Sequence, residues 1–179
     1  MTLWPIAGPE GVGKTTHARR YLSSVAGADN FVNLDEIARG YQPLRTAPDA
    51  ETARAAGCSA IGRLHEAITA RRSVAVETTL TAAHAVGMRV ELIFCLLPDV
   101  ETCLSRIAAR VSAGGHGVPE ADACRRYARA VRNFPDYAAL VNHWVVLDTG
   151  RTEPRLVAPG PPARIADAAL AEALPLRWN

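Results

Sequence analysis

The sequence predicts an α/β fold in which a mostly parallel central sheet is covered by helices on both faces. Short apolar runs alternate with amphipathic runs along the chain, which is typical of parallel strands joined by crossover helices. The first apolar run leads directly into Gly8-Pro9-Glu10-Gly11-Val12-Gly13-Lys14-Thr15, which matches G-x-x-x-x-G-K-[ST]. An amphipathic run follows this motif, so the predicted context of strand, glycine-rich loop and helix is complete.

The first half of the chain predicts strands and helices in alternation. Residues 3–7 predict a strand, and Pro5 within it predicts a short or irregular one, since proline lacks an N–H. Apolar residues at helical spacing predict a helix from the motif to about Gly27. Residues 31–35 and 73–79 predict two strands. Between these strands, residues 49–72 predict one helix, or two with a break at Gly57 and Gly62.

The second half repeats the alternation. Residues 90–97 predict a buried strand, and Asp99 predicts the N-cap of the next helix. A glycine-rich break at 112–118 precedes a helix that starts near Pro119 and Glu120 and ends near Leu140, with an interruption before Pro135. The last predicted elements are a strand at 144–148, a short edge strand at 155–158 that residues 159–162 end, and a terminal alanine-rich helix.

Composition limits the classes of protein. A chain of 179 residues predicts a single domain, residues 1–179, and a net charge of +2 gives no field that would favour a nucleic-acid or membrane partner. The four cysteines form no C-x-x-C pair and predict reduced, mostly structural thiols. No apolar run reaches the length of a membrane span, and the start of the chain leaves no room for a signal peptide. We therefore expect a cytoplasmic protein.

The motif predicts an ATP site. The chain has one lysine against nineteen arginines, and that lysine is Lys14. A compact ammonium fits between two phosphates, whereas a planar guanidinium does not. Backbone N–H groups of the loop face the phosphates, and the hydroxyl of Thr15 is a ligand for Mg²⁺. The expected nucleotide-binding residues are Gly8, Glu10, Gly11, Val12, Gly13, Lys14, Thr15 and Thr16.

Polar residues end the second and third predicted strands, at the sheet edge where ligands of α/β folds bind. Asp35 can accept a proton from a substrate hydroxyl as general base, or it can cap the helix that starts near Glu36. Glu77 and Thr79 can hold a polar substrate. Alternatively, Glu77 can organise Mg²⁺ through water.

Arginines gather after the fourth predicted strand. Arg125, Arg129 and Arg132 share a helical face with Arg126 beside them, and such like-charge neighbours cost a few tenths of a kcal/mol, roughly 0.2–0.5, unless an anion answers them. Phosphate is the expected anion. Arg110 and His116 flank the glycine-rich segment, so residues from about 110 to 132 predict a lid. The alternative is that these arginines only solvate a helix face.

Four blocks of sequence together resemble the zeta-toxin family, in particular its short chromosomal members. They are the loop at 8–16, residues 31–38, Glu77-Thr78-Thr79-Leu80, and residues 114–120 followed by Arg125-Arg126-Tyr127. The resemblance implies a three-layer P-loop fold of the nucleoside-kinase-like type with a lid. It also implies an ATP- and Mg²⁺-dependent kinase that phosphorylates a hydroxyl of the amino sugar in UDP-N-acetylglucosamine and is held inactive by a small antitoxin.

Carried over by position, the resemblance gives Asp35 the role of general base and lets Glu77 and Thr79 contact the UDP-sugar. It makes Arg110 a phosphate-clamping arginine. His116 stands where plasmid-borne family members have a second arginine, which leaves the second clamp to Arg125 or Arg126.

Other classes explain the sequence less well. A GTPase needs an N-K-x-D element, which a chain with Lys14 as its only lysine lacks. A transporter ATPase needs an acid pair at a strand end, but Asp148 is followed by Thr149. Two alternatives stay open: a kinase of another acceptor, such as a nucleoside, sugar or antibiotic, and a non-catalytic protein that uses its nucleotide site to control an interaction.

Overall fold

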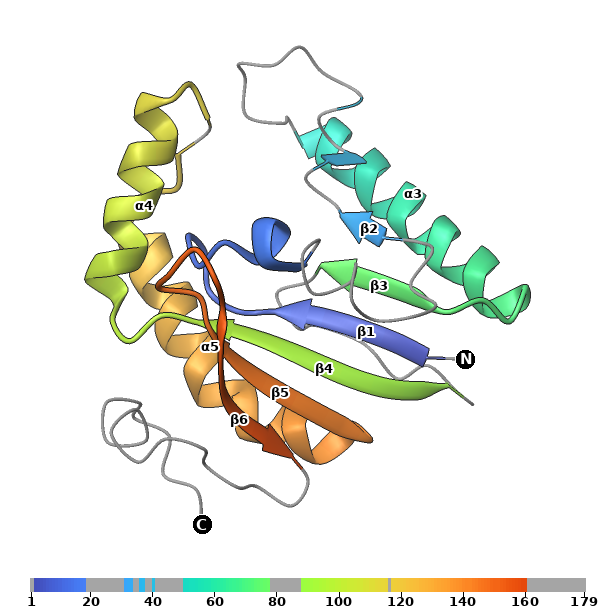
Figure 1. Ribbon diagram of the computed structural model, residues 1–179. Coiled ribbons are helices and arrows are strands. Elements are labelled where there is room, and N and C mark those ends of the chain that lie inside the picture. The colour runs from blue at the N-terminus through green and yellow to red at the C-terminus, as the bar shows by residue number, and fades with distance from the viewer. Residues whose placement is uncertain are drawn as a thin grey trace.

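The computed structural model describes residues 2–18, 31–33, 36–37, 40, 50–77, 88–115 and 117–160. Its centre is a six-stranded sheet with the strand order β2-β3-β1-β4-β5-β6 (Figure 1). The strands are β1 (Thr2–Ala7), β2 (Phe31–Asn33), β3 (Val74–Glu77), β4 (Arg89–Leu96), β5 (His143–Asp148) and β6 (Arg155–Gly160). Only β6 runs antiparallel to its neighbour, so the predicted mostly parallel sheet is confirmed.

The first strand has the irregularity that its proline predicts, but not the shortness. Strand β1 has six residues and pairs continuously with β3 from Leu3 to Ile6. On its other side it pairs with β4 through residues 2–3 and 6–7, and the register skips Trp4 and Pro5. A residue without an N–H is tolerated here because the pairing on the β3 side is unbroken.

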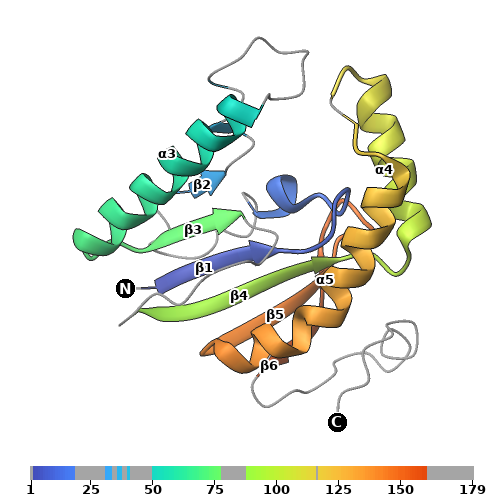
Figure 2. The same ribbon diagram turned by 180° about the vertical axis from the view of Figure 1, so that it is seen from behind.

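Two helices cover one face of the sheet, α3 (Ala50–Thr69) and α5 (Glu120–Leu140) (Figure 2). Helix α3 packs through Ala56 and Ala67 on the side of β1, β3 and β4. Helix α5 packs through Val131 and Phe134 on β4 and β5. Strand β4 contributes its even-numbered residues to this face, and all four are buried: Val90, Leu92, Phe94 and Leu96.

The opposite face begins its cover at the helical turn formed by residues 14–18. Ala18 packs there with Ile6, Ile93 and Cys95 of the sheet, and Cys103 of helix α4 (Val100–Ser112) belongs to the same cluster. The fold therefore has helices on both faces, as the alternating pattern predicts.

The cap predicted for α4 is confirmed. The side chain of Asp99 accepts a hydrogen bond from the backbone N–H of Thr102 at 2.6 Å, and the pKa of this carboxyl is lowered by its hydrogen bonds with Thr102. The cap fixes where β4 ends and α4 begins, and so fixes the position of the arginines that α4 carries.

One predicted helix break is wrong, and of the two arrangements left open for residues 49–72 the structure has the single helix. Helix α3 runs unbroken through Gly57 and Gly62; each costs about 1 kcal/mol relative to alanine, and packing of the buried face offsets this cost. Helix α5 runs through Pro135. Beside that proline, the ring of Phe134 is fully buried and lies 4.6 Å from that of Phe94, so tertiary packing offsets the missing hydrogen bond.

The edge strand at 155–158 is confirmed, although its predicted end is wrong. Strand β6 includes Pro159 and Gly160, and it is a sheet edge, where proline is tolerated. A side chain at Gly160 would lie 2.1 Å from the ring of Trp144, so only glycine fits there.

Several sequence predictions lie outside the described residues. They are the later part of the helix that follows the phosphate-binding loop, the last two residues of the second predicted strand, and the terminal helix. Within the described residues, no helix combines the length and the apolar character that crossing a membrane requires.

Candidate functional site

The glycine-rich loop joins β1 to the first helical turn, and its backbone takes conformations that favour glycine. Gly8, Gly11 and Gly13 have φ angles of 142°, 78° and 83°. A Cβ at Gly8 would lie 2.1 Å from the carbonyl oxygen of Cys95, and one at Gly11 would lie 2.6 Å from that of Cys103. The loop therefore lies directly against β4 and α4, and no side chain larger than hydrogen fits at these two positions.

Lys14 starts the helical turn and is largely shielded from solvent, with 8% of its surface exposed. Its Nζ donates a hydrogen bond to the carbonyl oxygen of Pro9 at 2.9 Å, so the side chain curls back over its own loop. A shielded ammonium that meets a neutral carbonyl is poorly compensated and favours an anion at the same place. The neighbouring Thr16 is exposed, whereas Val12 is buried in the core.

Three side chains meet where β1, β2 and β3 end. The hydroxyl of Thr15 donates to Oε2 of Glu77 at 2.7 Å, and Nδ2 of Asn33 donates to the same oxygen at 2.7 Å. Asn33 Nδ2 also lies 3.4 Å from the Thr15 hydroxyl. Parallel pairing of β3 with both β1 and β2 places these three strand ends side by side. This acidic network, Thr15, Asn33 and Glu77, adjoins the phosphate-binding loop.

Sequence reasoning missed Asn33. Its side-chain oxygen accepts a hydrogen bond from the backbone N–H of Glu36 at 3.1 Å, so one amide both joins the acidic network and caps the following turn. The sequence offers Asp35 as that cap, but the described cap is Asn33. In the predicted strand 31–35, residues two apart share a face, so the sequence pattern that selects Asp35 applies equally to Asn33.

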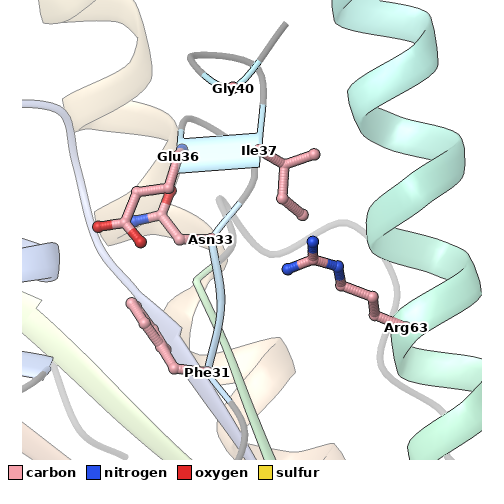
Figure 3. Close-up of a pocket in the computed structure, with 6 residues that line it drawn as sticks. All are labelled: Phe31, Asn33, Glu36, Ile37, Gly40 and Arg63. Carbon is pink, nitrogen blue, oxygen red and sulfur yellow. The ribbon is translucent and has the colours of Figure 1, made fainter.

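A cavity of about 340 Å³ adjoins Asn33. Figure 3 shows Phe31 and Glu36 on one side of it and Arg63, which extends from α3, on the other. Asn33 lines this cavity and is also a member of the acidic network, through its bond to Glu77. Asn33 therefore belongs both to the wall of the cavity and to the polar contacts beside the phosphate-binding loop.

On the other side of the loop, α4 contributes a guanidinium that sequence reasoning also missed. Arg106 donates to the carbonyl oxygens of Thr149 at 2.8 Å and Gly150 at 3.1 Å, and lies 3.5 Å from that of Val12. It therefore joins the loop to the turn that follows β5. The spacing of Arg106 and Arg110, four residues apart on one helix, was the signal for a shared face.

Arg110 lies at the end of α4. Its Nε and Nη2 atoms are shielded from solvent and have no hydrogen-bond acceptor among the residues that the structure describes. The glycine turn folds against its stem, since a Cβ at Gly115 would lie 2.7 Å from Cγ of Arg110. Such donors favour an anionic partner.

Helix α5 carries the two arginines predicted as alternatives for the second clamp. Arg126 forms an ion pair with Glu10 of the loop at 3.0 Å. Arg125 pairs with Asp122 of its own helix at 2.9 Å, and 68% of its side chain is exposed. The structure thus brings Arg126 to the loop and gives Arg125 a local partner.

Three predicted site residues, Asp35, Thr79 and His116, lie outside the described residues. Their proposed roles stay predictions. All four cysteines are free. Cys95 and Cys103 are buried, and burial raises their pKa values to about 12 and about 11, whereas Cys58 is exposed.

The donor set fits a magnesium ion that arrives with a nucleotide. Within the described ranges, no group of three or more histidine, cysteine, aspartate or glutamate side chains could hold a metal by itself. Mg²⁺ in phosphate-transferring sites needs only one or two protein oxygens besides phosphate and water. The hydroxyl of Thr15 and the carboxylate of Glu77, which already touch, supply these oxygens.

Solved structures share this fold. A protein from Chloroflexus aurantiacus J-10-fl, assigned provisionally as a kinase, has a TM-score of 0.55 and 20% identity over 72% of this chain and 78% of its own. The PezAT chromosomal toxin-antitoxin system of Streptococcus pneumoniae matches with a TM-score of 0.57 and 15% identity. This match covers 97% of the present chain and 77% of the other. A chain of the Pnkp1/Rnl/Hen1 RNA repair complex matches with a TM-score of 0.60 and 16% identity, over 76% of the present chain and 45% of its own length.

Identities this low establish the fold alone. No curated protein sequence is similar enough to count as a relative. The model of the AAA_33 family, described as an AAA domain, matches residues 3–133, which include the glycine-rich loop, the acidic network and the arginines of α4. By this match and by its P-loop kinase-like fold, the chain belongs to the AAA_33 family of P-loop domains.

Proposed function

We propose that this protein is an ATP-dependent phosphotransferase that moves the γ-phosphate to a hydroxyl group of a small molecule. The observation that carries the proposal is the double role of Asn33, which lines the cavity and also bonds Glu77 within the acidic network. A nucleotide on the loop and an acceptor in the cavity then meet at the ends of β1, β2 and β3. This arrangement suits direct transfer between two bound molecules.

Each side of the loop has its own role in this proposal. Backbone N–H groups of the loop and Lys14 bind the phosphates of ATP. Lys14 exchanges the Pro9 carbonyl for a phosphate oxygen. Arg110, whose guanidinium has two shielded donors without a described acceptor, neutralises charge on the transferred group. Asp35 acts as the general base on the acceptor hydroxyl, as its place in the sequence predicts.

Glu77 and Thr15 are the residues that hold Mg²⁺ in this proposal. The ion, when bound with ATP, neutralises phosphate charge and orients the γ-phosphate. Their direct hydrogen bond favours this reading of Glu77 over a contact with the acceptor, because the carboxylate faces the loop hydroxyl. Asn33 keeps the carboxylate in place through its own bond to Oε2.

We assign a UDP-N-acetyl-amino sugar such as UDP-N-acetylglucosamine as the acceptor, and a small antitoxin protein as a partner. The support is the resemblance to zeta toxins in sequence and the fold shared with the PezAT toxin-antitoxin system. The cavity suits such an acceptor in kind: it offers the ring of Phe31 for a base and the guanidinium of Arg63 for a diphosphate. Residues 1–179 act as one catalytic domain in this proposal. Of the lid predicted at about 110–132, the part that moves is the segment before α5, because Ala123 and Val131 of α5 are buried.

The test is an acceptor panel analysed by mass spectrometry. The protein is incubated with ATP, Mg²⁺ and UDP-amino sugars, other UDP-sugars, nucleosides, free sugars or an oligonucleotide with a 5′-hydroxyl. We expect a UDP-amino sugar to gain one phosphate. The control is Asp35→Asn, which should lower turnover by ~10²–10⁴ while ATP affinity stays nearly unchanged.

Each other outcome is informative. Phosphorylation of a different acceptor would keep the phosphotransferase and replace its substrate. ATP binding without transfer to any acceptor would instead support a nucleotide-dependent interaction protein. An Asp35→Asn variant that unfolds would mean that this carboxylate is structural.

A further inference from the structure

An ion pair connects the phosphate-binding loop to a helix far away in the sequence. Nη1 of Arg126 in α5 donates to Oε1 of Glu10 at 3.0 Å, across a separation of 116 residues. The pair is partly shielded, with 39% of the arginine side chain and 19% of the glutamate side chain exposed. Because its two members come from different elements, the pair fixes the distance between α5 and the loop.

A carboxylate in this loop needs an explanation, since the loop binds a polyanion. Glu10 is the third residue of the motif, between Gly8 and Gly13, whose backbone turns around the phosphates. An unpaired negative charge there would repel the nucleotide. Pairing with Arg126 removes that repulsion and holds a guanidinium beside the place where phosphate binds.

The helix that presents this guanidinium is firmly attached to the sheet. The next residue, Tyr127, donates its hydroxyl to the carbonyl oxygen of Leu97 at 2.8 Å, and Ala123 and Phe134 of α5 are buried. Burial raises the pKa of Tyr127 to about 12, so its hydroxyl remains a donor at neutral pH. Arg126 is therefore set by its backbone on one side and by Glu10 on the other.

Arg126 has donors to spare. A guanidinium carries five N–H groups. In the part of the chain that the structure describes, the bond to Glu10 is the hydrogen bond that this side chain makes, and it uses Nη1. The remaining N–H groups are available for a phosphate while the bond to Glu10 is kept.

We infer that Glu10 is a positioning residue, which holds Arg126 at the phosphate-binding loop so that the guanidinium contacts the transferred phosphoryl group. This inference rests on the proposed phosphotransfer, and it gives Arg126 rather than Arg125 the second cationic role. Glu10 acts through Arg126 and does not touch the substrate.

The chain offers a matched control on the same helix. Arg125 and Asp122 form an ion pair of nearly the same length, 2.9 Å, but both members lie on α5. That pair cannot fix α5 relative to the loop. Asp122→Asn therefore makes the same chemical change as Glu10→Gln in a pair that joins nothing to the loop.

The experiment measures kcat and KM for ATP, together with affinity for ADP alone and for ADP with tetrafluoroaluminate, which mimics the transferred phosphoryl group. Glu10→Gln should lower kcat and the affinity for the tetrafluoroaluminate complex by about tenfold, in the range for residues that orient a first ligand. Affinity for ADP alone should stay equal or rise, since a negative charge is removed. Asp122→Asn should match the wild type in all four quantities.

A second pair of variants tests whether Glu10 acts through Arg126. Arg126→Ala should lower kcat at least as much as Glu10→Gln does. Adding Glu10→Gln to Arg126→Ala should cause no further loss, because the residue that Glu10 positions is gone. Arg126→Lys keeps the charge without the planar fork and serves as the variant if Arg126→Ala does not fold.

Several results would overturn the inference. They are wild-type kcat and analogue affinity in Glu10→Gln, a rise in kcat in that variant, or an equal loss from Glu10→Gln when Arg126 is already alanine. If the wild type phosphorylates no acceptor, the proposed function fails, and the tetrafluoroaluminate affinities still decide the role of Glu10. A wild type that binds no nucleotide overturns both.

Discussion

The two ends of the parallel strands differ in how their polar groups are satisfied. At the amino ends, Glu91 accepts hydrogen bonds from Trp4 at 2.9 Å and from Arg89 at 2.6 Å. The backbone N–H of Val90 donates to the side chain of Asn142 at 2.7 Å. The bond from Trp4 joins β1 to β4, and the bond to Asn142 joins β4 to the residue before β5, whereas Arg89 and Glu91 lie on the same strand.

At the carboxyl ends, several charged groups have incomplete or neutral partners. In the described part of the chain, Lys14 bonds a neutral carbonyl of its own loop, and two nitrogens of Arg110 have no acceptor there. Buried polar groups are usually paired, so such exceptions need a reason. Polar groups at the amino ends therefore stabilise the sheet, whereas cationic side chains near the carboxyl ends are left to bind an anion from outside the described residues. Variants at one end should therefore change activity, and variants at the other should change stability.

The largest expected effect is at Lys14. Lys14→Arg should lower phosphoryl transfer by roughly 10³-fold or more, the range for a cation that neutralises the transferred group, because the fork cannot take the place of the ammonium. Thermal unfolding should change little, since the charge is kept. The measurement is steady-state turnover beside a melting curve, and near wild-type turnover would remove the basis for the phosphate-binding role.

The next effect is at Glu77, on the acidic side of the loop. Glu77→Gln should lower turnover by about 10–100-fold and raise the Mg²⁺ concentration needed for half-maximal activity, because the amide is a weaker partner for the metal and for Thr15. A magnesium titration of variant and wild type measures this. An unchanged magnesium requirement with a higher KM for the acceptor would instead place Glu77 in the acceptor site.

Arg106 should give a mixed and smaller effect, because it joins the loop to the turn after β5. Arg106→Ala removes donors to the carbonyls of Thr149 and Gly150 and should cost about 1–2 kcal/mol of stability, in the range for hydrogen bonds from charged groups that are partly exposed. That corresponds to a fall in Tm of roughly 2–8 °C for a chain of this size. Nucleotide affinity should fall with it. Full stability in this variant would contradict the joining role.

The smallest effect is at the amino ends and depends on pH. Burial raises the pKa of Glu91, but hydrogen bonds from Arg89 and Trp4 outweigh it, so the pKa of this carboxyl lies below its usual 4.5. A lowered pKa in the folded state gives stability that is present above about pH 4.5 and is lost as pH falls through the folded value. The contribution is about 1 kcal/mol or less, because Arg89 is exposed.

The control for this prediction is Glu91→Gln. The difference in Tm between wild type and Glu91→Gln should shrink as pH falls from 6 towards 3, while their turnover at neutral pH stays equal. A loss of turnover in Glu91→Gln would break the comparison between the two ends of the sheet.

The strands and most helices could be predicted because each has a local pattern. Apolar runs predicted the strand boundaries to within a few residues. Asp99 predicted the start of α4 because its side chain caps the helix by accepting from the backbone N–H of Thr102. The predicted interruption before Pro135 was wrong, and α3 is one helix rather than two, because tertiary packing outweighs a local cost of one residue. No local pattern records that packing.

The candidate site was predictable where the chemistry is local to a motif. The loop from Gly8 to Thr15 is such a motif. Glu77 could be predicted because it ends a strand, and ligands of α/β folds bind at the carboxyl ends of the strands. Asn33 and Arg106 could not be found in the same way, because their roles come from contacts between strands β2 and β3 and between α4 and the turn after β5. Only the strand order makes these segments neighbours.

The curled side chain of Lys14 also offers a chemical reporter of nucleotide binding. Since the chain has no other lysine, an amine-directed acylating reagent has two targets, the terminal amine and Lys14. The shielded ammonium, 8% exposed and bonded to the carbonyl of Pro9, should react slowly. A bound nucleotide that takes the place of that carbonyl would change the acylation rate at one atom, which gives a reporter of site occupancy without any engineered residue.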